Sequence, residues 1–369
     1  MGNDLPTPDS IAELTPEWLT RALHAGGVIG AETVTAATYE PLGAGAGFVG
    51  QLARIQLTYD RRPEGAPETL IAKMPGLDPG ARELAALYGL YELEFRFYSE
   101  IADEMTFRTA RCYYAAGDAA SVRYVLLIED MGATGTLGDQ VKGCTLEQAR
   151  MAIRHLAAHH AHWWRNPRLA EIAWLSPGVD LVAGALTQSY PVCWERALET
   201  LGDEMPPQIR EAIPTLGTHV LKLMEPLRES ALTLGHGDYR LDNMFFGNAG
   251  SGYEIAVLDW QSPNKGWGAY DVAYFLYSNL DVETRRQHED TMLRDYHAGL
   301  VAGGVRDYSY EQLHDDYVAS MLVSLAIWVI NAATLDTANE RGFALFQLFF
   351  ERLSAAILDL NALDRIPAA

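Results

Sequence analysis

The sequence predicts an α+β fold in which a smaller, β-rich lobe precedes a larger, mostly helical lobe. The chain has 369 residues, a length that suits two lobes. Short segments of alternating hydrophobicity dominate the first third, and long stretches of helical period dominate the rest. We expect the boundary near residue 132, so that an N-terminal extension and the smaller lobe occupy residues 1–132 and the larger lobe residues 133–369.

The composition excludes several classes of protein. With 49% hydrophobic and 21% charged residues, the chain is typical of a globular protein rather than a disordered or fibrous one. Its net charge of −21 repels phosphate backbones, so we expect no nucleic-acid partner, and any bound anion needs local cations or a metal. Three widely spaced cysteines argue against a disulfide scaffold or a zinc ribbon and favour the cytoplasm: Cys112, Cys144 and Cys193.

Two segments bear on targeting and membranes. The first 14 residues have neither a basic start nor an apolar core, so we expect no signal peptide. Residues 317–335 carry no charge and approach the length of a bilayer span. Four polar residues interrupt this stretch: Ser320, Ser324, Asn331 and Thr334. We therefore expect a buried core helix and no membrane partner, with a membrane span as the less favoured alternative.

In the smaller lobe, caps and periodicity predict the elements. Thr15 as N-cap and Pro16 just after it predict a short helix. An apolar stripe of helical period predicts a long helix over residues 81–105. Strands are expected on either side of that helix, at residues 34–42, 54–59, 70–73 and 122–128.

The larger lobe is expected to be helical, with one interruption. Residues 145–164 predict one helix, and most of residues 281–360 predict others. The interruption is a short β segment, residues 243–246 and 253–258, joined by a glycine-rich turn.

A glycine motif joins the first two strands. Gly45, Gly47 and Gly50 match the pattern G-x-G-x-x-G. A dinucleotide-binding domain needs a helix after this pattern, but here a strand follows, so a dehydrogenase is disfavoured. A glycine hairpin between strands is the arrangement that covers nucleotide phosphates in protein kinases. An Ala/Gly-rich surface turn is the alternative.

A lysine and a glutamate are candidates for an ion pair. Lys73 lies on a predicted strand, where most lysines are simply solvated. On the helix that follows, Glu94 lies near the apolar stripe, whereas Glu92 lies further from it. Because an unpaired buried charge is costly, Glu94 needs a partner, and Lys73 is a plausible one. Such a pair holds the α- and β-phosphates in kinase-like folds.

The strongest motif surrounds Asp238. Asp238 and Asn243 are five residues apart, the spacing of the base and the metal-binding asparagine in a kinase catalytic loop. Asp259 follows an apolar strand and suits a second metal ligand. The order of these groups after the glycines, Lys73 and Glu94 is far more specific than any single match.

These motifs resemble those of the aminoglycoside phosphotransferase-like small-molecule kinases. The matching segments are residues 236–243, 258–261 and 271–276, and the chain is most similar to the ecdysteroid-kinase-like branch, where Asp-x-Gln follows the second metal strand. The resemblance covers about residues 30–300 and implies the two-lobed protein-kinase-like fold. It also implies ATP at a hinge from Glu129 to Met131, Mg²⁺ as cofactor, and Asp271 as a brace beneath the catalytic loop.

Some positions differ from protein kinases. Gly237 replaces the arginine of His-Arg-Asp, and the short interval between Asp259 and Asp271 leaves little room for an activation loop, which favours a small-molecule acceptor. Arg240 takes the place of a lysine that meets the γ-phosphate; that role and a salt bridge are equally compatible with the sequence. Asp242 is expected to stabilise its own turn.

A histidine cluster on the helix over residues 145–164 comprises His155, His159, His160 and His162. No carboxylate follows in the manner of the H-E-x-x-H zinc motif. We expect these side chains to pack in the core, with substrate contact and a metal site as alternatives.

The sequence as a whole favours an ATP- and Mg²⁺-dependent phosphotransferase that acts on a hydroxyl of a small molecule. Asp238 and Arg240 are the expected catalytic residues, and Asn243 and Asp259 the metal ligands. Eight Trp and 18 Tyr favour a bulky apolar alcohol, although the acidic surface suits a cationic acceptor equally. The alternatives are a hydroxyacyl-thioester, aminoglycoside or macrolide kinase, and a non-catalytic nucleotide-binding protein. The sequence does not indicate the oligomeric state.

Overall fold

The computed structural model describes residues 5–42, 50–201, 205–228, 232–333 and 340–366. Gly45 and Gly47 lie outside these ranges, whereas Gly50 begins a strand. The chain forms two compact units: unit 1 comprises Met1–Thr136 and Gly247–Ser262, and unit 2 comprises Leu137–Phe246 and Pro263–Ala369. Residues 247–262, which we expected in the larger lobe, therefore cluster with unit 1.

Unit 1 is built on an antiparallel five-stranded sheet. The strand order is β1-β2-β3-β5-β4. The strands are β1 (Val34–Pro41), β2 (Gly50–Tyr59), β3 (Thr69–Pro75), β4 (Cys112–Asp118) and β5 (Arg123–Glu129). The sequence did not predict β4. A register shift between Cys112 and Tyr114 lets Tyr113 and Tyr114 both be buried, which removes the alternation that marks a strand.

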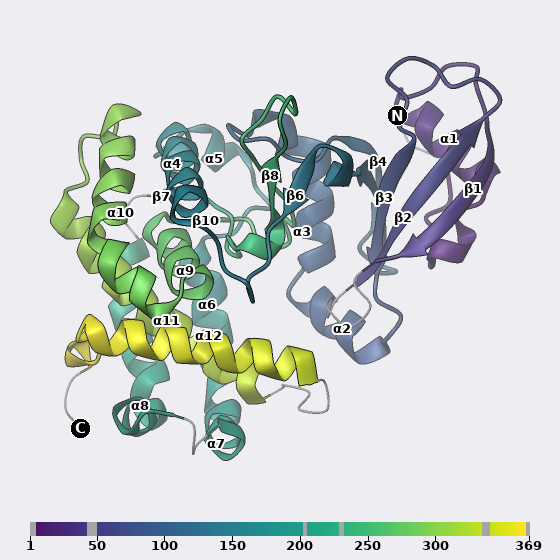
Figure 1. Cartoon of the computed structure of the whole chain (residues 1–369). Helices are drawn as coiled ribbons and strands as arrows, with labels where there is room; N and C mark the ends of the chain where they lie inside the picture. Colours follow the sequence, from purple (N-terminus) through teal and green to yellow (C-terminus); the bar gives the residue numbers. More distant parts are fainter. Residues whose placement is uncertain (1–4, 43–49, 202–204, 229–231, 334–339, 367–369) are drawn as a thin grey trace. The chain divides into compact units, whose positions relative to one another are not determined.

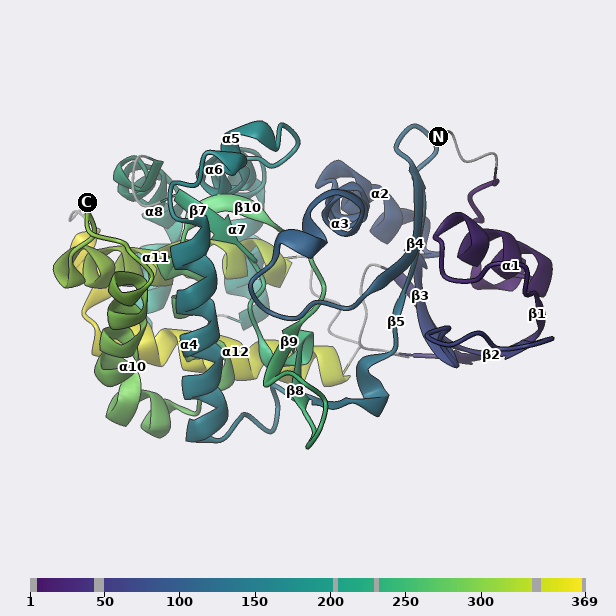
Figure 2. The same ribbon diagram turned by 90° about the horizontal axis from the view of Figure 1, so that it is seen from above.

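Helices cover both faces of this sheet. The first, α1 (Pro16–Ala25), begins as predicted, with Thr15 Oγ1 accepting a hydrogen bond from the Trp18 backbone N–H at 3.2 Å. It buries Trp18, Leu19 and Leu23 in a core shared with the sheet. Figure 2, in which the sheet is seen edge-on, shows α1 on one side and α3 (Leu90–Arg96) on the other.

The long helix predicted over residues 81–105 is divided. It consists of α2 (Pro79–Leu87), α3, a π-helical turn (Phe97–Ile101) and a 3₁₀ turn (Ala102–Glu104). Gly89 separates α2 from α3 and has a φ of 67°, a left-handed conformation that a continuous helix does not contain. The apolar stripe still faces inward after the break, because Tyr91, Phe97 and Ile101 are buried.

Unit 2 is mainly helical (Figure 1). Its helices are α4 (Leu146–Trp163), α5 (Arg168–Glu171), α6 (Gly178–Gln188), α7 (Tyr190–Leu201), α8 (Pro207–Met224), α9 (Ala269–Asn279), α10 (Val282–Ala302), α11 (Tyr310–Ala333) and α12 (Glu340–Asp359). A capping box of Thr145 and Gln148 begins α4. Strands β7 (Leu232–Gly235) and β10 (Asn264–Trp267) pair antiparallel. Three short strands complete the chain: β6 (Gly135–Leu137), β8 (Met244–Gly247) and β9 (Ile255–Val257), of which β9 belongs to unit 1.

The apolar helix α11 lies in the core of unit 2. By length and composition alone it could cross a membrane, but 72% of its apolar window is buried inside the structure. One of its polar interruptions is satisfied there, since Ser320 Oγ accepts from Trp267 Nε1 at 2.8 Å and donates to Asp316 O at 2.7 Å. Both observations agree with the core helix expected from the sequence.

Candidate active site

In unit 1, Lys73 lies between two carboxylates. Its Nζ donates to Glu94 Oε1 at 2.8 Å and to Asp259 Oδ1 at 2.5 Å. The predicted Lys73–Glu94 pair is therefore confirmed. The competing residue, Glu92, pairs instead with Arg96 at 2.8 Å on its own helix. The helical period correctly distinguished the two glutamates, because only Glu94 is buried, with 3% of its surface exposed.

Burial and charge oppose each other in this cluster. Burial raises the pKa of Glu94 to about 7, although the Lys73 ammonium acts to lower it. Burial disfavours the charged form of Lys73, but Asp259 and Glu94 more than offset this, so its pKa lies above the ordinary value. Lys73 therefore stays charged at neutral pH and is available to bind an anion.

Gln261 joins this cluster and was not predicted as a site residue. Its Nε2 donates to Glu94 Oε2 at 3.3 Å, so the two oxygens of Glu94 have different partners. The only sequence signal was the Asp-x-Gln spacing from Asp259. Asp259 itself follows β9 and has a left-handed backbone, with a φ of 61°.

The predicted hinge begins at the end of β5. The Glu129 carboxylate pairs with the Arg108 guanidinium and accepts from Arg111 N at 3.0 Å. Asp130 accepts from Arg54 Nε at 2.7 Å, and Met131 is buried. Because both carboxylates are engaged within unit 1, the predicted role of this segment in binding adenine rests on its backbone groups.

In unit 2, the loop after β7 is fastened to Asp271, the third residue of α9. Asp271 Oδ2 accepts from His236 N at 2.7 Å, and Oδ1 accepts from Gly237 N at 2.9 Å. Gly237 has a φ of 80°, which favours glycine and explains why no side chain stands at this turn. The bracing contact expected for Asp271 is therefore confirmed.

Charge supports this brace. Burial acts to raise the pKa of Asp271, but the His160 side chain and the His236 backbone N–H more than offset that effect and hold the pKa below its ordinary value. An anionic Asp271 can accept both loop N–H groups at once.

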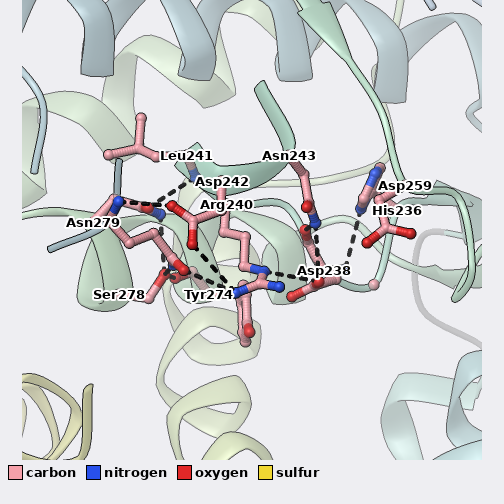
Figure 3. A network of polar contacts seen from close by, with 12 residues as sticks. His236, Asp238, Arg240, Leu241, Asp242, Asn243, Asp259, Tyr274, Ser278 and Asn279 are labelled. Atoms are coloured by element: carbon pink, nitrogen blue, oxygen red, sulfur yellow. Dashed lines mark hydrogen bonds and ion pairs between the residues drawn. The ribbon is translucent and has the colours of Figure 1, made fainter. Parts of the chain in front are cut away.

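The central group of the loop is the Asp238 carboxylate (Figure 3). Asp238 Oδ2 accepts from Asn243 Nδ2 and from Arg240 Nε, each at 2.9 Å. Asn243 Nδ2 also donates to the Asp238 carbonyl oxygen at 2.9 Å. The amide nitrogen of Asn243 is thus used within the loop, whereas its oxygen, the atom that binds hard cations, is not part of these contacts.

Arg240 is held from a second side by Gln140, which the sequence did not single out. Arg240 Nη1 donates to Gln140 Oε1 at 2.9 Å, and Gln140 is fully buried. Asp242, which we expected to stabilise its own turn, instead accepts from Gln140 N at 2.8 Å. A partner 100 residues away leaves no mark in local sequence spacing, so neither contact was predictable.

Two of the four histidines of α4, His159 and His160, are buried and packed in the core, whereas His155 is half-buried and His162 is exposed. The Nε2 of His159 donates to Leu234 O at 3.0 Å, which ties α4 to β7. His160 Nδ1 lies 2.7 Å from Tyr296 Oη, and its Nε2 lies 3.3 Å from Asp271 Oδ2. Among the residues that the structure describes, no three His, Cys, Asp or Glu side chains form a group able to hold a metal ion. The packing interpretation is confirmed for His159 and His160 and is wrong for the exposed His162.

Several tryptophans and tyrosines of unit 2 differ in burial. Trp163, Trp267 and Tyr190 are buried in the core. The others are partly exposed: Trp164, Trp174, Trp194, Tyr270 and Trp328.

One aromatic row runs along α9 and continues onto α11. Tyr270 stacks on Tyr274 with ring centroids 6.1 Å apart, and Tyr274 meets Tyr277 edge-on at 5.5 Å. Trp328 Nε1 donates to Tyr277 Oη at 3.0 Å. Tyr270, Tyr274, Tyr277 and Trp328 are called the aromatic row below.

Comparison with known proteins agrees with the fold. Similar solved structures include a microcompartment-associated aminopropanol kinase (16% identity, 89% of this chain and 94% of that chain covered, TM-score 0.53). They also include choline kinase from Cryptosporidium parvum Iowa II (11%, 89% and 91%, 0.51) and an amicoumacin kinase in complex with AMP-PNP and Ca²⁺ (14%, 86% and 87%, 0.51). At these identities the likeness shows the fold alone, and that fold is kinase-like.

No curated protein sequence matches the chain. The model of the Ecdysteroid kinase-like family matches residues 44–308, more than two thirds of the chain. That span includes Lys73, Glu94, the loop around Asp238, and Asp259. The chain therefore belongs to the ecdysteroid kinase-like family.

Proposed function

We propose that this chain transfers the γ-phosphate of ATP, in a Mg²⁺-dependent reaction, to a hydroxyl group of a small molecule. The observation that carries the proposal is the hydrogen bond between Asp238 and Asn243 in a braced loop. An aspartate followed five residues later by an asparagine is the arrangement of a kinase catalytic loop, in which the aspartate accepts the proton of the acceptor hydroxyl and the asparagine binds the metal. Membership of a family of small-molecule kinases supports the same reaction.

The residues present fit magnesium and a nucleotide. Asn243 offers an amide oxygen and Asp259 a carboxylate, and hard cations prefer such oxygens. Bound Mg²⁺ would neutralise charge on the phosphates. Lys73, charged and braced by Glu94, would hold the α- and β-phosphates. The amicoumacin kinase with AMP-PNP and Ca²⁺ supports this assignment, since its complex joins an ATP analogue and a hard cation on a similar fold.

The chemical step is assigned to the loop in unit 2. Asp238 would orient the acceptor hydroxyl and receive its proton as the oxygen bonds to the γ-phosphorus and the bond to the ADP oxygen breaks. Asp238 is suited to this because 27% of its side chain is exposed. Arg240, bonded to Asp238 and Gln140, would stabilise charge on the transferred phosphoryl group.

The aromatic row favours a bulky apolar alcohol as acceptor. Burial raises the pKa of Tyr274 well above its ordinary value, and the negative charge of Asp238 adds to the shift, so this ring lies near the proposed base. Figure 3 likewise shows Tyr274 beside Arg240. An apolar acceptor would pack on the partly exposed rings of the row, Tyr270, Tyr274 and Trp328, and leave its hydroxyl near Asp238. The net charge of −21 favours a cationic acceptor, such as an aminoglycoside, as the second candidate.

A screen of alcohols with Mg·ATP, read by mass spectrometry, tests the proposal. The library contains sterol-like and macrolide alcohols, aminoglycosides, hydroxyacyl thioesters and small amino alcohols. We expect phosphorylated products among the bulky apolar alcohols and none with Asp238→Asn. A chain that binds Mg·ATP yet neither phosphorylates any acceptor nor hydrolyses ATP slowly would be a non-catalytic nucleotide-binding protein, contrary to the proposal.

A further inference from the structure

We infer that Gln261 is a positioning residue for Lys73, because its side-chain amide fixes the glutamate with which the lysine pairs. This inference rests on the proposed function, in which Lys73 holds the nucleotide phosphates. It concerns three side chains of unit 1 that come from separate elements: β3, α3 and the segment after β9.

The two oxygens of Glu94 have separate partners. Oε1 accepts from Lys73 Nζ at 2.8 Å, and Oε2 accepts from Gln261 Nε2 at 3.3 Å. A carboxylate with only 3% of its surface exposed depends on such donors, since water cannot replace them. With Gln261 in place, the orientation of Glu94 does not depend on the lysine alone.

Gln261 is itself held in place by the two residues before it. Trp260 stacks on Phe97, just after α3, with centroids 4.1 Å apart and planes 7° apart. Its Nε1 donates to Val257 O at 3.2 Å. Asp259 has a left-handed φ of 61°, a conformation that few residues other than glycine, asparagine and aspartate adopt. Three consecutive side chains thus contact Lys73, Phe97 and Glu94 in turn.

This arrangement matters because Lys73 has two carboxylate partners in the structure, Glu94 and Asp259. The proposed function assigns Asp259 to the metal, so Lys73 has to exchange Asp259 for a phosphate while it keeps Glu94. Such an exchange needs a Glu94 that stays in place when the Asp259 contact is lost. The Gln261 amide provides that second attachment, so its removal is expected to weaken nucleotide binding and leave acceptor binding unchanged.

Lys73, Glu94 and Gln261 also line one pocket. The remaining lining residues are Met74, Pro75, Tyr91, Tyr124 and Leu126. Tyr91 is tied to the end of β3, because Gly76 N donates to its hydroxyl at 3.2 Å. Gln261→Met removes the amide while it keeps the length of the side chain. The apolar and aromatic residues that line the pocket can pack against the thioether of the new side chain.

The test compares Gln261→Met with Gln56→Met, which alters an exposed glutamine on β2 of the same unit. Calorimetry gives the Kd of Mg·ATP, and steady-state kinetics give both KM values and kcat. For Gln261→Met we expect the Kd and the KM for ATP to rise about tenfold, the usual scale for one hydrogen bond to a charged group.

The KM of the acceptor should stay within about twofold, and Gln56→Met should match the wild type. A variant that only folds less completely would lower kcat and leave both KM values unchanged, and that result would overturn the inference.

A second measurement needs neither nucleotide nor turnover. Glu94→Leu removes the carboxylate that the Gln261 amide contacts. Because the loss of one partner of a buried ion pair is itself destabilising, the effect of Gln261→Met is compared within each background. Gln261→Met should lower the melting temperature of the nucleotide-free chain, but not when Glu94→Leu is already present. Equal losses in both backgrounds would show that the two side chains are not coupled. If the wild type fails to bind Mg·ATP, the proposed function is wrong. The comparison of Gln261→Met with and without Glu94→Leu still decides whether Gln261 positions Glu94.

Discussion

Asp238 and Asp259, the two aspartates of the proposed function, have different immediate surroundings, each within its own unit. Asp238 accepts from the Asn243 amide and the Arg240 guanidinium, which leaves an exposed carboxylate edge suited to a hydroxyl. Asp259 contacts the Lys73 ammonium, the group that would meet phosphate. These surroundings support one aspartate as the partner of the acceptor and the other as a partner of the metal.

Asparagine substitutions separate the two roles. Asp238→Asn keeps the size of the side chain but removes the proton acceptor, so turnover should fall by about 10²–10⁴-fold with Mg·ATP affinity retained. Asp259→Asn removes a charged metal ligand, so affinity and rate should fall together. Calorimetry and a coupled assay measure both quantities for each variant. Equal losses of affinity in the two variants would show that the roles are assigned wrongly.

At the scale of elements, α4 is fixed to β7 by a buried neutral histidine. Burial, with His160 beside it, holds the pKa of His159 well below its ordinary value, and its Nε2 donates to Leu234 O. The unfolded chain therefore binds a proton below about pH 6.5 that the folded chain does not. The neutral His159 therefore contributes to the unfolding free energy fully above about pH 6.5, and this contribution is lost as the pH falls below that value.

The unfolding free energy should decrease on acidification below pH 6.5, by up to about 1.4 kcal/mol per pH unit for this one group. His159→Gln keeps a neutral donor near the same place and does not titrate, so its profile should be flatter in this range. Urea denaturation at pH 5, 6 and 7 measures the slopes. Parallel profiles for the two proteins would contradict a neutral, buried His159.

The break between α2 and α3 gives a second prediction for an element. Gly89 has a φ of 67° and its added Cβ would meet no atom, so Gly89→Ala should cost about 1–2 kcal/mol through backbone strain alone. Gly184, inside α6, also has open space around its Cβ position but has no positive φ. Gly184→Ala should therefore stabilise the chain by about 0.5–1 kcal/mol. Chemical denaturation measures both, and changes of the same sign would refute the role given to Gly89.

Patterns with a local period predicted the elements that have one. The cap of α1 and the helical face of Glu94 were confirmed in this way. The contact of Asp271 with the loop, which the family resemblance implied, was confirmed as well. Strand β4 was missed because its bulge buries two adjacent tyrosines. Gln140 and Gln261 were missed because their contacts with Arg240 and Glu94 join residues 100 and 167 positions apart, and an amide side chain carries no charge to suggest a partner.

For the whole molecule, the net charge of −21 sets the terms of nucleotide binding. A field of that sign repels free ATP, so the proposed binding needs the metal together with local cations, for which Lys73 and Arg240 are the candidates. A ligand that binds only the folded chain stabilises it by mass action, by about 2.7 kcal/mol at a concentration one hundred times Kd. The melting temperature of the chain therefore reports directly on nucleotide binding.

The most direct test is the melting temperature of the wild type and of Lys73→Ala, each with EDTA, with ATP and EDTA, and with saturating Mg·ATP. We predict a clear rise for the wild type with Mg·ATP, little change when ATP is given with EDTA, and a much smaller rise for Lys73→Ala. Thr58→Ala, an exposed change on the same sheet, serves as control and should match the wild type. A melting curve of the wild type that neither Mg·ATP nor Mg·ADP moves would contradict the assignment of this chain as an ATP-dependent phosphotransferase.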